Sequence, residues 1–331
     1  LVMKIGVVGC GALGSYYGGL LCRNGHDVHF LLRSDYQHVT THGVSVESPK
    51  GNFTFTPHTH QKASEIGPCN LVIIGLKTTA NHLFPTLLPP LIGTDTIVLT
   101  LQNGLGNEEA LTQCVHPDQI LGGLCFVCLN RIRPGLIRHM DHGLIVMGEW
   151  TGPARQKTLD LVDGFNQAGI PCKSTDHLMQ AHWEKLMWNI PFNGLGVAGH
   201  LGHGGFESDI PLLETIPSEQ CLDANALLDD PVWETRVRCL MKEVRTAAGK
   251  LGHPIDEGFA DQLVARTRTM GPYKASTLID YERGYPLEMD SLFREPLRQA
   301  KAAAFPTPLL ERMVLILEEL QRRQDKRDLS T

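Results

Sequence analysis

The sequence lacks a long apolar run. A helix that crosses a bilayer needs about 20 consecutive apolar residues. The apolar run 71–76 is far shorter, and prolines interrupt the apolar stretch 83–92. We therefore expect no membrane segment and no membrane partner.

An excess of positive charge is also lacking. The 331 residues include 36 Asp and Glu against 30 Lys and Arg, which gives a net charge of -6. The basic residues are scattered, apart from a short run within 322–327, so the chain has no general basic field of the kind that attracts nucleic acid. We expect no nucleic-acid partner.

The cysteines and histidines show no pattern of a disulfide framework or a metal site. Nine cysteines at irregular spacing, with no secretion-signal pattern ahead of Met3, are typical of reduced thiols, so we expect a cytoplasmic protein. Cys125 and Cys128 have the C-x-x-C spacing, but they lie in a predicted strand that places them on opposite faces, which favours a structural role over a redox role. His200 and His203 have no further ligand group at zinc-like spacing. We expect no metal.

The first half of the chain alternates short β-branched runs with amphipathic stretches, which is typical of parallel strands joined by helices. The predicted strands are 4–8, 27–32, 71–76, 96–101, 120–128 and 144–147, and the predicted helices are 12–24, 80–88, 107–114 and 154–168. Pro134-Gly135 predicts a hairpin turn and an edge strand within 131–142, so that the sheet ends in antiparallel strands.

The second half loses the strand pattern after Pro171 and shows the apolar spacing of helices. The predicted helices are 177–192, 231–251, 257–269, 289–304 and 308–324. A chain of 331 residues fits two domains. We place an α/β domain at 1–175 and an all-α domain at 176–331.

A glycine-rich motif, G-x-G-x-x-G, follows the first predicted strand and opens the first predicted helix. The first glycine permits a tight turn, the second lets a pyrophosphate approach the backbone, and the third lets helix and strand pack closely. The helix N-terminus adds unpaired amides and a positive dipole. The motif predicts a Rossmann-type dinucleotide-binding domain, with cofactor-binding residues Gly9, Cys10, Gly11, Ala12, Leu13 and Gly14.

The end of the second predicted strand predicts the choice of cofactor. NAD-selective sites place an acid there for the ribose 2′-hydroxyl, whereas this chain has Arg33 followed by Ser34. Arg33 suits the 2′-phosphate of NADP, so we expect NADPH/NADP. The alternative is that Arg33 is only a solvated residue and that Asp35 takes the ribose.

Two further strand ends carry polar groups where an open α/β sheet binds ligands. Lys77 follows one strand, and Gln102-Asn103-Gly104 follows the next. We expect Lys77 and Asn103 to face the cofactor, although Asn-Gly is also a common turn dipeptide.

A polar stripe marks the first predicted helix of the second half. Lys185, Asn189 and Asn193 recur every four residues, which puts them on one face, while the other positions are largely apolar. Such a helix is buried nearly all round. A lysine there tends towards a lowered pKa, which suits a general acid for a carbonyl oxygen. The alternative is a surface helix with a solvated Lys185.

These features resemble the ketopantoate reductase family, and the resemblance runs from Met3 to about Leu320. The glycine motif, Lys77, the segment 102–106, the Lys185 helix, and the pair Ser276 and Glu288 follow one another in family order. The resemblance implies a helical domain similar to that of the 6-phosphogluconate dehydrogenase superfamily and NADPH-dependent reduction of ketopantoate to pantoate.

The same resemblance implies roles for single residues. Lys185 becomes the general acid, Glu288 binds the substrate hydroxyl, and Ser276 binds the carboxylate. Lys77 contacts the adenosine phosphate end of the cofactor. Asn103, Asn189 and Asn193 position substrate and nicotinamide. A homodimer is compatible with these features.

Departures from the family pattern leave alternatives open. Pro191 predicts a kink in the Lys185 helix, the stretch 193–200 is rich in glycine, the segment 200–230 is long, and Arg294-Glu295-Pro296 replaces a frequent glycine. A related reductase of another branched or bulkier 2-keto acid is therefore the alternative. An NADPH-binding sensor without turnover is a third interpretation, but it would need neither Lys185 nor Glu288.

Overall fold

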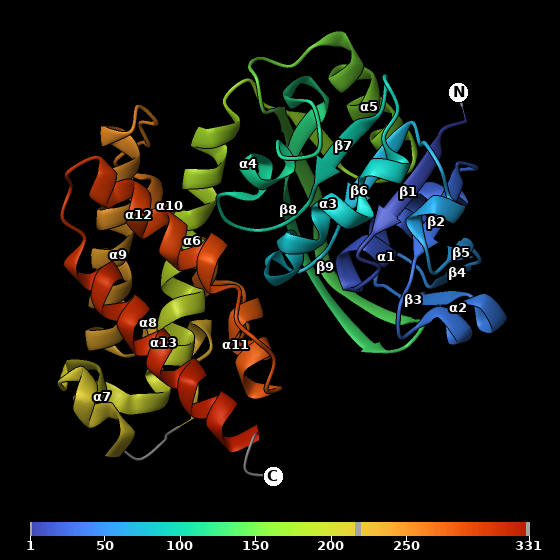
Figure 1. Ribbon diagram of the computed structural model, residues 1–331. Helices are drawn as coiled ribbons and strands as arrows, with labels where there is room; N and C mark the ends of the chain where they lie inside the picture. The colour runs from blue at the N-terminus through green and yellow to red at the C-terminus, as the bar shows by residue number, and fades with distance from the viewer. Residues whose placement is uncertain (1, 216–219, 329–331) are drawn as a thin grey trace. The chain divides into compact units, whose positions relative to one another are not determined.

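The computed structural model describes residues 2–215 and 220–328. The chain forms two compact units, 1–178 and 179–331, which divide shortly after the predicted boundary at residue 175 (Figure 1). A mixed sheet with helices fills the first unit, and helices fill the described part of the second. This arrangement confirms the predicted fold class.

One sheet organises the first unit. Its strands run in the order β4-β3-β9-β8-β7-β6-β1-β2-β5, and β10 also pairs with β9. The strands are β1 (Lys4–Val8), β2 (Asp27–Leu31), β3 (Val44–Glu47), β4 (Phe53–Phe55), β5 (His58–His60), β6 (Leu71–Ile74), β7 (Ile97–Thr100), β8 (Ile120–Arg133), β9 (Leu136–Glu149) and β10 (Cys172–Ser174).

The central strands are parallel, as the sequence predicts, but the hairpin does not form an edge. Strands β8, β7, β6, β1, β2 and β5 are parallel neighbours, and β8 and β9 form the predicted antiparallel hairpin around Pro134-Gly135. The predicted edge strand is wrong, because β9 also pairs in parallel with β3 and β10. The sequence did not predict either partner, since β3 has four residues and β10 has three.

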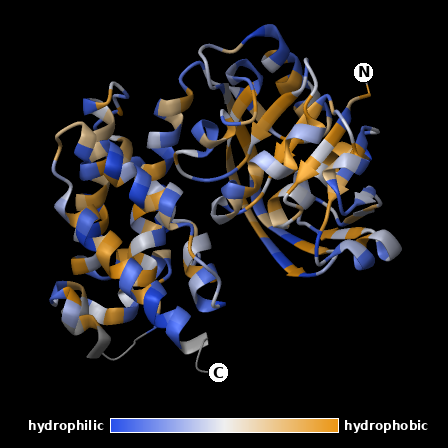
Figure 2. Cartoon of the chain, in the orientation of Figure 1, coloured by the Kyte–Doolittle hydropathy of each residue, from blue (hydrophilic) through white to orange (hydrophobic). Residues whose placement is uncertain are grey.

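The sheet buries both of its faces. Along β6, Leu71 and Ile73 join one apolar cluster, while Val72 and Ile74 join another on the opposite face. This alternation follows from the two-residue period of a strand and explains why the whole strand is apolar. Figure 2 shows the central strands coloured mainly as hydrophobic.

Helices in the first unit are shorter than predicted, most of all within the predicted ranges 80–88 and 107–114. They are α1 (Ala12–Arg23), α2 (Tyr36–His42), α3 (Phe84–Leu87), α4 (Asn107–Leu111) and α5 (Gln156–Gln167), with 3₁₀ turns η1 (Ala63–Glu65), η2 (Thr78–Leu83), η3 (Pro89–Leu91) and η4 (Pro117–Gln119). The predicted helix 80–88 is split between η2 and α3, with Pro85 in the first turn of α3. Proline fits there because no helical partner for its missing N–H is needed.

The second unit is built from helices α6 to α13. They are α6 (Leu178–Ala198), α7 (Gly202–Glu207), α8 (Ala224–Asp229), α9 (Pro231–Lys250), α10 (Phe259–Arg268), α11 (Ser276–Glu282), α12 (Glu295–Ala302) and α13 (Pro308–Asp328), with 3₁₀ turns η5 (Gly199–Leu201) and η6 (Ile210–Thr215) and a π turn η7 (Asp290–Arg294). The sequence did not predict α7, α8 or α11, which have seven residues or fewer. The predicted helix 289–304 is divided into η7 and α12.

Helix α6 continues through Pro191. It reaches Ala198, beyond the predicted end at residue 192, so this proline does not terminate the helix. The residues from 186 to 199 are almost all buried. The predicted burial is therefore confirmed for the second half of the helix, while residues 177–185 are only partly buried. The predicted kink stays a prediction.

Glycines at the end of α6 let other segments pack against its backbone. A Cβ on Gly194 would overlap the sulfur of Met313 in α13. A Cβ on Gly196 would lie 2.9 Å from the carbonyl oxygen of Leu222, and one on Gly199 would lie 2.5 Å from the Leu222 side chain. The glycine-rich stretch after Asn193 therefore serves close packing in this unit.

Candidate cofactor and catalytic sites

Two glycines of the loop between β1 and α1 are required by the protein itself. Gly9 has φ of +94°, and a Cβ on it would lie 2.5 Å from the carbonyl carbon of Gly75. A Cβ on Gly14 would overlap the carbonyl oxygen of Gly9. Larger residues at these positions would separate the loop from α1 and from the end of β6.

The packing of the protein does not require a glycine at position 11. Its φ is -73°, which other residues adopt, and a Cβ on it would meet no protein atom within 4 Å. The first turn of α1, which follows it, carries no acidic residue, and Gly11 offers no side-chain cap. The loop thus leaves open space beside the positive end of a helix, which fits the pyrophosphate of a dinucleotide.

The other residues of the motif pack inward. Cys10, Ala12 and Leu13 contact the apolar cluster of the first unit, and the Cys10 thiol donates to the carbonyl oxygen of Val7 over 3.4 Å. Burial raises the pKa of the Cys10 thiol well above its ordinary value. The thiol therefore stays protonated at neutral pH, and the backbone is the part of this loop suited to a phosphate.

Just after β2, an arginine is exposed to solvent and a nearby acid is buried. Arg33 and Ser34 are exposed, and the Arg33 guanidinium has no ion pair within the described part of the chain. The Asp35 carboxylate is buried and accepts two bonds from Arg131, Nε to Oδ2 at 2.9 Å and Nη2 to Oδ1 at 2.5 Å. This engagement disfavours the alternative in which Asp35 takes the ribose.

The ends of β6 and β7 are joined by a hydrogen-bond network. Gln102 Nε2 donates to the carbonyl oxygen of Leu76 at 3.0 Å and to Asn81 Oδ1 at 2.7 Å. Asn81 Nδ2 donates to Asn107 Oδ1 at 2.9 Å, and Asn107 Nδ2 donates to the carbonyl oxygen of Asn103 at 3.0 Å. Gln102 is therefore a structural residue, and sequence reasoning missed the two asparagines that connect it to Asn103.

The network brings the segments that carry Lys77 and Asn103 to one edge of the sheet. Lys77 directly follows Leu76 and is exposed. The amide of Gly75 donates to the carbonyl oxygen of Val8 at 2.8 Å, which places the glycine loop at the same edge. This is the carboxyl edge of parallel strands, where such sheets bind ligands.

In the second unit, α6 buries its two asparagines more deeply than its lysine. Asn189 and Asn193 are buried, and Lys185 is half-buried. Asn193 Oδ1 accepts from the backbone N–H of Thr277 at 2.8 Å and from Ser276 Oγ at 3.3 Å. Asn193 thereby satisfies an amide in the first turn of α11 and meets Ser276 directly.

The remaining predicted residue of the second unit is Glu288. Its side chain is buried, and its carbonyl oxygen accepts from the backbone N–H of Leu292 in the π turn at 3.3 Å. A π turn is common at functional sites. It was not predictable here, because the sequence of η7 is compatible with an ordinary α-helix.

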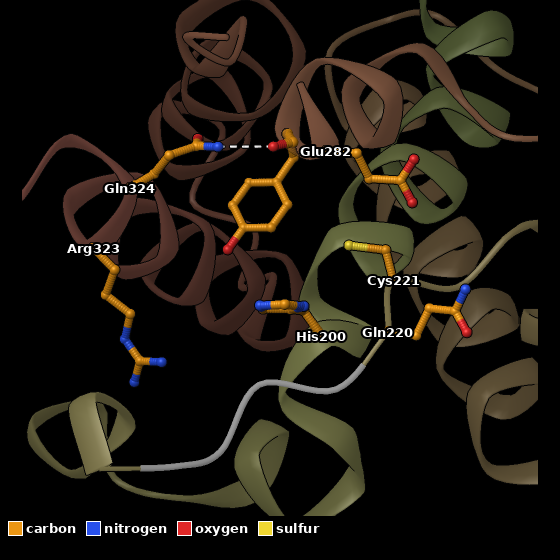
Figure 3. Close-up of a pocket in the computed structure, with 7 residues that line it drawn as sticks. His200, Gln220, Cys221, Glu282, Arg323 and Gln324 are labelled. Carbon is orange, nitrogen blue, oxygen red and sulfur yellow. Dashed lines mark hydrogen bonds between the residues drawn. The ribbon is translucent and has the colours of Figure 1, made fainter. Parts of the chain in front are cut away.

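A separate cavity of about 350 Å³ lies within the second unit (Figure 3). Glu282 there pairs with Lys274 at 2.8 Å, and Arg323 pairs with Glu319 at 3.3 Å. The lining residues are His200, Gln220, Cys221, Tyr281, Glu282, Arg323 and Gln324. None of the predicted site residues lines it.

Within residues 2–215 and 220–328, no group of three His, Cys, Asp or Glu residues is arranged to hold a metal ion. No helix in this part of the chain is long and apolar enough to cross a membrane. All nine cysteines lie in the described part of the chain, and none of them, Cys125 and Cys128 on β8 included, forms a disulfide.

Two family models match the chain. Residues 5–152 match the model described as ketopantoate reductase PanE/ApbA, and residues 221–321 match its C-terminal counterpart. A 2-dehydropantoate 2-reductase from Nostoc sp. is 38% identical over 92% of this chain and 91% of its own length.

Solved structures are similar over nearly the whole chain. The 2-dehydropantoate 2-reductase from Geobacter metallireducens is 41% identical, with a TM-score of 0.86 over 95% of this chain and 98% of that one. D-mandelate dehydrogenase with NADH and anilino(oxo)acetate has a TM-score of 0.82 at 18% identity, covering 98% of this chain and 99% of that one. At that identity the likeness shows the fold alone.

Proposed function

The chain belongs to the ketopantoate reductase family, a family of NAD(P)H-dependent oxidoreductases, and we propose that it reduces ketopantoate to pantoate with NADPH, as in pantothenate biosynthesis. The observation that carries this proposal is the similarity, along nearly the whole of both chains, to relatives that bear the name 2-dehydropantoate 2-reductase.

The first unit binds the cofactor in this proposal. The backbone of the glycine loop and the N-terminus of α1 hold the pyrophosphate, and Gly11 supplies the space. Arg33 bonds the 2′-phosphate, which gives the preference for NADPH over NADH. Lys77 and Asn103 contact the cofactor from the neighbouring strand ends. Bound NADPH supplies the hydride that adds to the keto carbon.

The second unit supplies the acid and the substrate contacts. Lys185 protonates the carbonyl oxygen as hydride arrives. Asn189, Asn193 and Ser276 bind and orient the substrate, and Glu288 accepts a hydrogen bond from its hydroxyl. The hydrogen bond between Ser276 and Asn193 supports a shared role for these two residues.

The test is NADPH oxidation with a panel of 2-keto acids. A substrate without the hydroxyl would lose the hydrogen bond that the buried Glu288 carboxylate accepts, so ketopantoate should exceed 2-ketoisovalerate in kcat/KM by about two orders of magnitude. Glu288→Ala should erase most of this gap. Glu282→Ala is the matched control, because Glu282 on α11 pairs with Lys274 and should leave the gap unchanged.

Equal rates on both substrates, or activity only on bulkier keto acids, would favour the alternative reductase. NADPH binding without turnover on any of them would favour the sensor. The homodimer and the cytoplasmic location stay predictions. Sedimentation tests the homodimer, and cell fractionation tests the location.

A further inference from the structure

The Asp35 carboxylate is held more completely than an ordinary surface acid. Its side chain is only 11% exposed. Arg131 donates hydrogen bonds to both of its oxygens, and Ser34 Oγ donates to Oδ1 at 3.1 Å. Asp35 stands at the N-cap of α2, yet its side chain makes no capping hydrogen bond. Its interactions are therefore directed to Arg131 rather than to the helix.

Arg131 is held in place by the hairpin that carries it. The backbone N–H of Ser45 at the start of β3 donates to the carbonyl oxygen of Gly135 in the hairpin turn at 2.8 Å, and β3 then pairs with β9. A Cβ on Gly135 would lie 2.5 Å from the ring of His38 in α2. The hairpin turn thus packs closely against the helix that Asp35 opens.

The position of Asp35 explains why its carboxylate needs to be held. It lies two residues after Arg33 and one after Ser34, at the strand end where NAD-selective sites place a ribose-binding acid. A released carboxylate could accept hydrogen bonds from the ribose hydroxyls of NADH. It could also pair with Arg33 and repel a 2′-phosphate.

We propose that Arg131 is a positioning residue that sets the preference for NADPH by holding the Asp35 carboxylate away from the ribose and from Arg33. This inference rests on the proposed cofactor site. The sequence alone assigns the preference for NADPH to Arg33. The inference gives Arg131, which lies far along the chain on β8, a part in the same preference.

The test is titration of NADPH and NADH binding by nicotinamide fluorescence. Arg131→Gln keeps a long polar side chain but releases the carboxylate. It should weaken NADPH binding by about tenfold or more and leave NADH binding equal or tighter, so that the selectivity ratio falls at least about tenfold. The double variant Asp35→Asn with Arg131→Gln removes the released charge and should restore the ratio to within about threefold of the unmodified protein.

Arg138→Gln is the matched control. Arg138 lies on the same hairpin and pairs with Glu47 at 2.9 Å, with both side chains about half exposed. Surface ion pairs of this kind contribute little, so this variant should leave the ratio unchanged. Asp35→Asn alone should also keep the preference for NADPH, since it removes the group that Arg131 holds.

Three results would overturn the inference. The first is an unchanged ratio in Arg131→Gln. The second is a fall that persists in the double variant, which would indicate loss of loop structure instead of a released charge. The third is loss of the NADPH preference in Asp35→Asn. Failure of the unmodified protein to bind either cofactor is a distinct result, because it contradicts the proposed function itself.

Discussion

Gly11 of the first loop differs from the glycines of α6 and η5 in what lies beside it. Next to Gly11 there is no protein atom that an added Cβ would meet, whereas Gly194, Gly196 and Gly199 each lie against another segment of the second unit. One glycine leaves room for a ligand, and the others leave room for the protein. Whether a single glycine leaves space for a ligand or for the packing of the protein is therefore decided by its surroundings.

The same contrast separates the two regions as a whole. The first loop offers backbone groups and a helix N-terminus, and the exposed Arg33 follows β2. The proposed function assigns cofactor binding to these groups. Helix α6 carries Lys185 and two buried asparagines, to which the proposed function assigns the acid and the substrate contacts. Changes in the first region should alter binding, and changes in α6 should alter chemistry or stability.

The largest expected effect is on catalysis. Lys185→Ala should lower turnover by about 100-fold or more, the usual range for a lost general acid, and leave NADPH affinity nearly unchanged. Steady-state kinetics with ketopantoate and a separate NADPH titration measure the two quantities. A variant that keeps most of its turnover would make Lys185 a structural residue.

A smaller effect is expected on stability. Gly194→Val should lower the free energy of unfolding by about 1–3 kcal/mol, because the added atoms overlap Met313 in a packed interior. Urea denaturation measures this. Gly164→Ala on α5 is the control, since a Cβ there meets nothing within 4 Å. It should stabilise the protein by about 1 kcal/mol through helix propensity.

The preference for NADPH over NADH should depend on Arg33. Arg33→Ala removes a charge-assisted bond and should weaken NADPH binding by about tenfold or more, with little effect on NADH. Fluorescence titration with both cofactors decides this. If the unmodified protein binds the two equally, the assignment of Arg33 to the 2′-phosphate is wrong.

The smallest expected effect is on the NADPH affinity of a Gly11 variant, and it tests the comparison of the glycines directly. Gly11→Ala places a methyl group in the open space of the loop, so it should weaken NADPH binding by a factor of about ten while the free energy of unfolding changes by less than about 0.5 kcal/mol. Paired titration and denaturation curves test both parts. A loss of stability without a loss of affinity would show that the space serves the fold.

The sequence by itself determined the features that depend on neighbours along the chain. Strand β1 and helices α1 and α9 lie within one or two residues of their predicted ranges, because apolar period, proline and glycine act locally. The motif from Gly9 to Gly14 is recognisable for the same reason, since its turn, its close approach and its helix start follow one another within six residues.

Only the tertiary structure decided features whose partners are distant. Asp35 and Arg131 are 96 residues apart, and Asn193 and Thr277 are 84 apart, so no local pattern records that they bond. The predicted edge at β9 was wrong because β3 pairs with it from far upstream. Helix α6 runs through Pro191 and two glycines because packing against Leu222 and Met313 outweighs the weak helix propensity of those residues. Contacts of this kind exist only after the chain has folded.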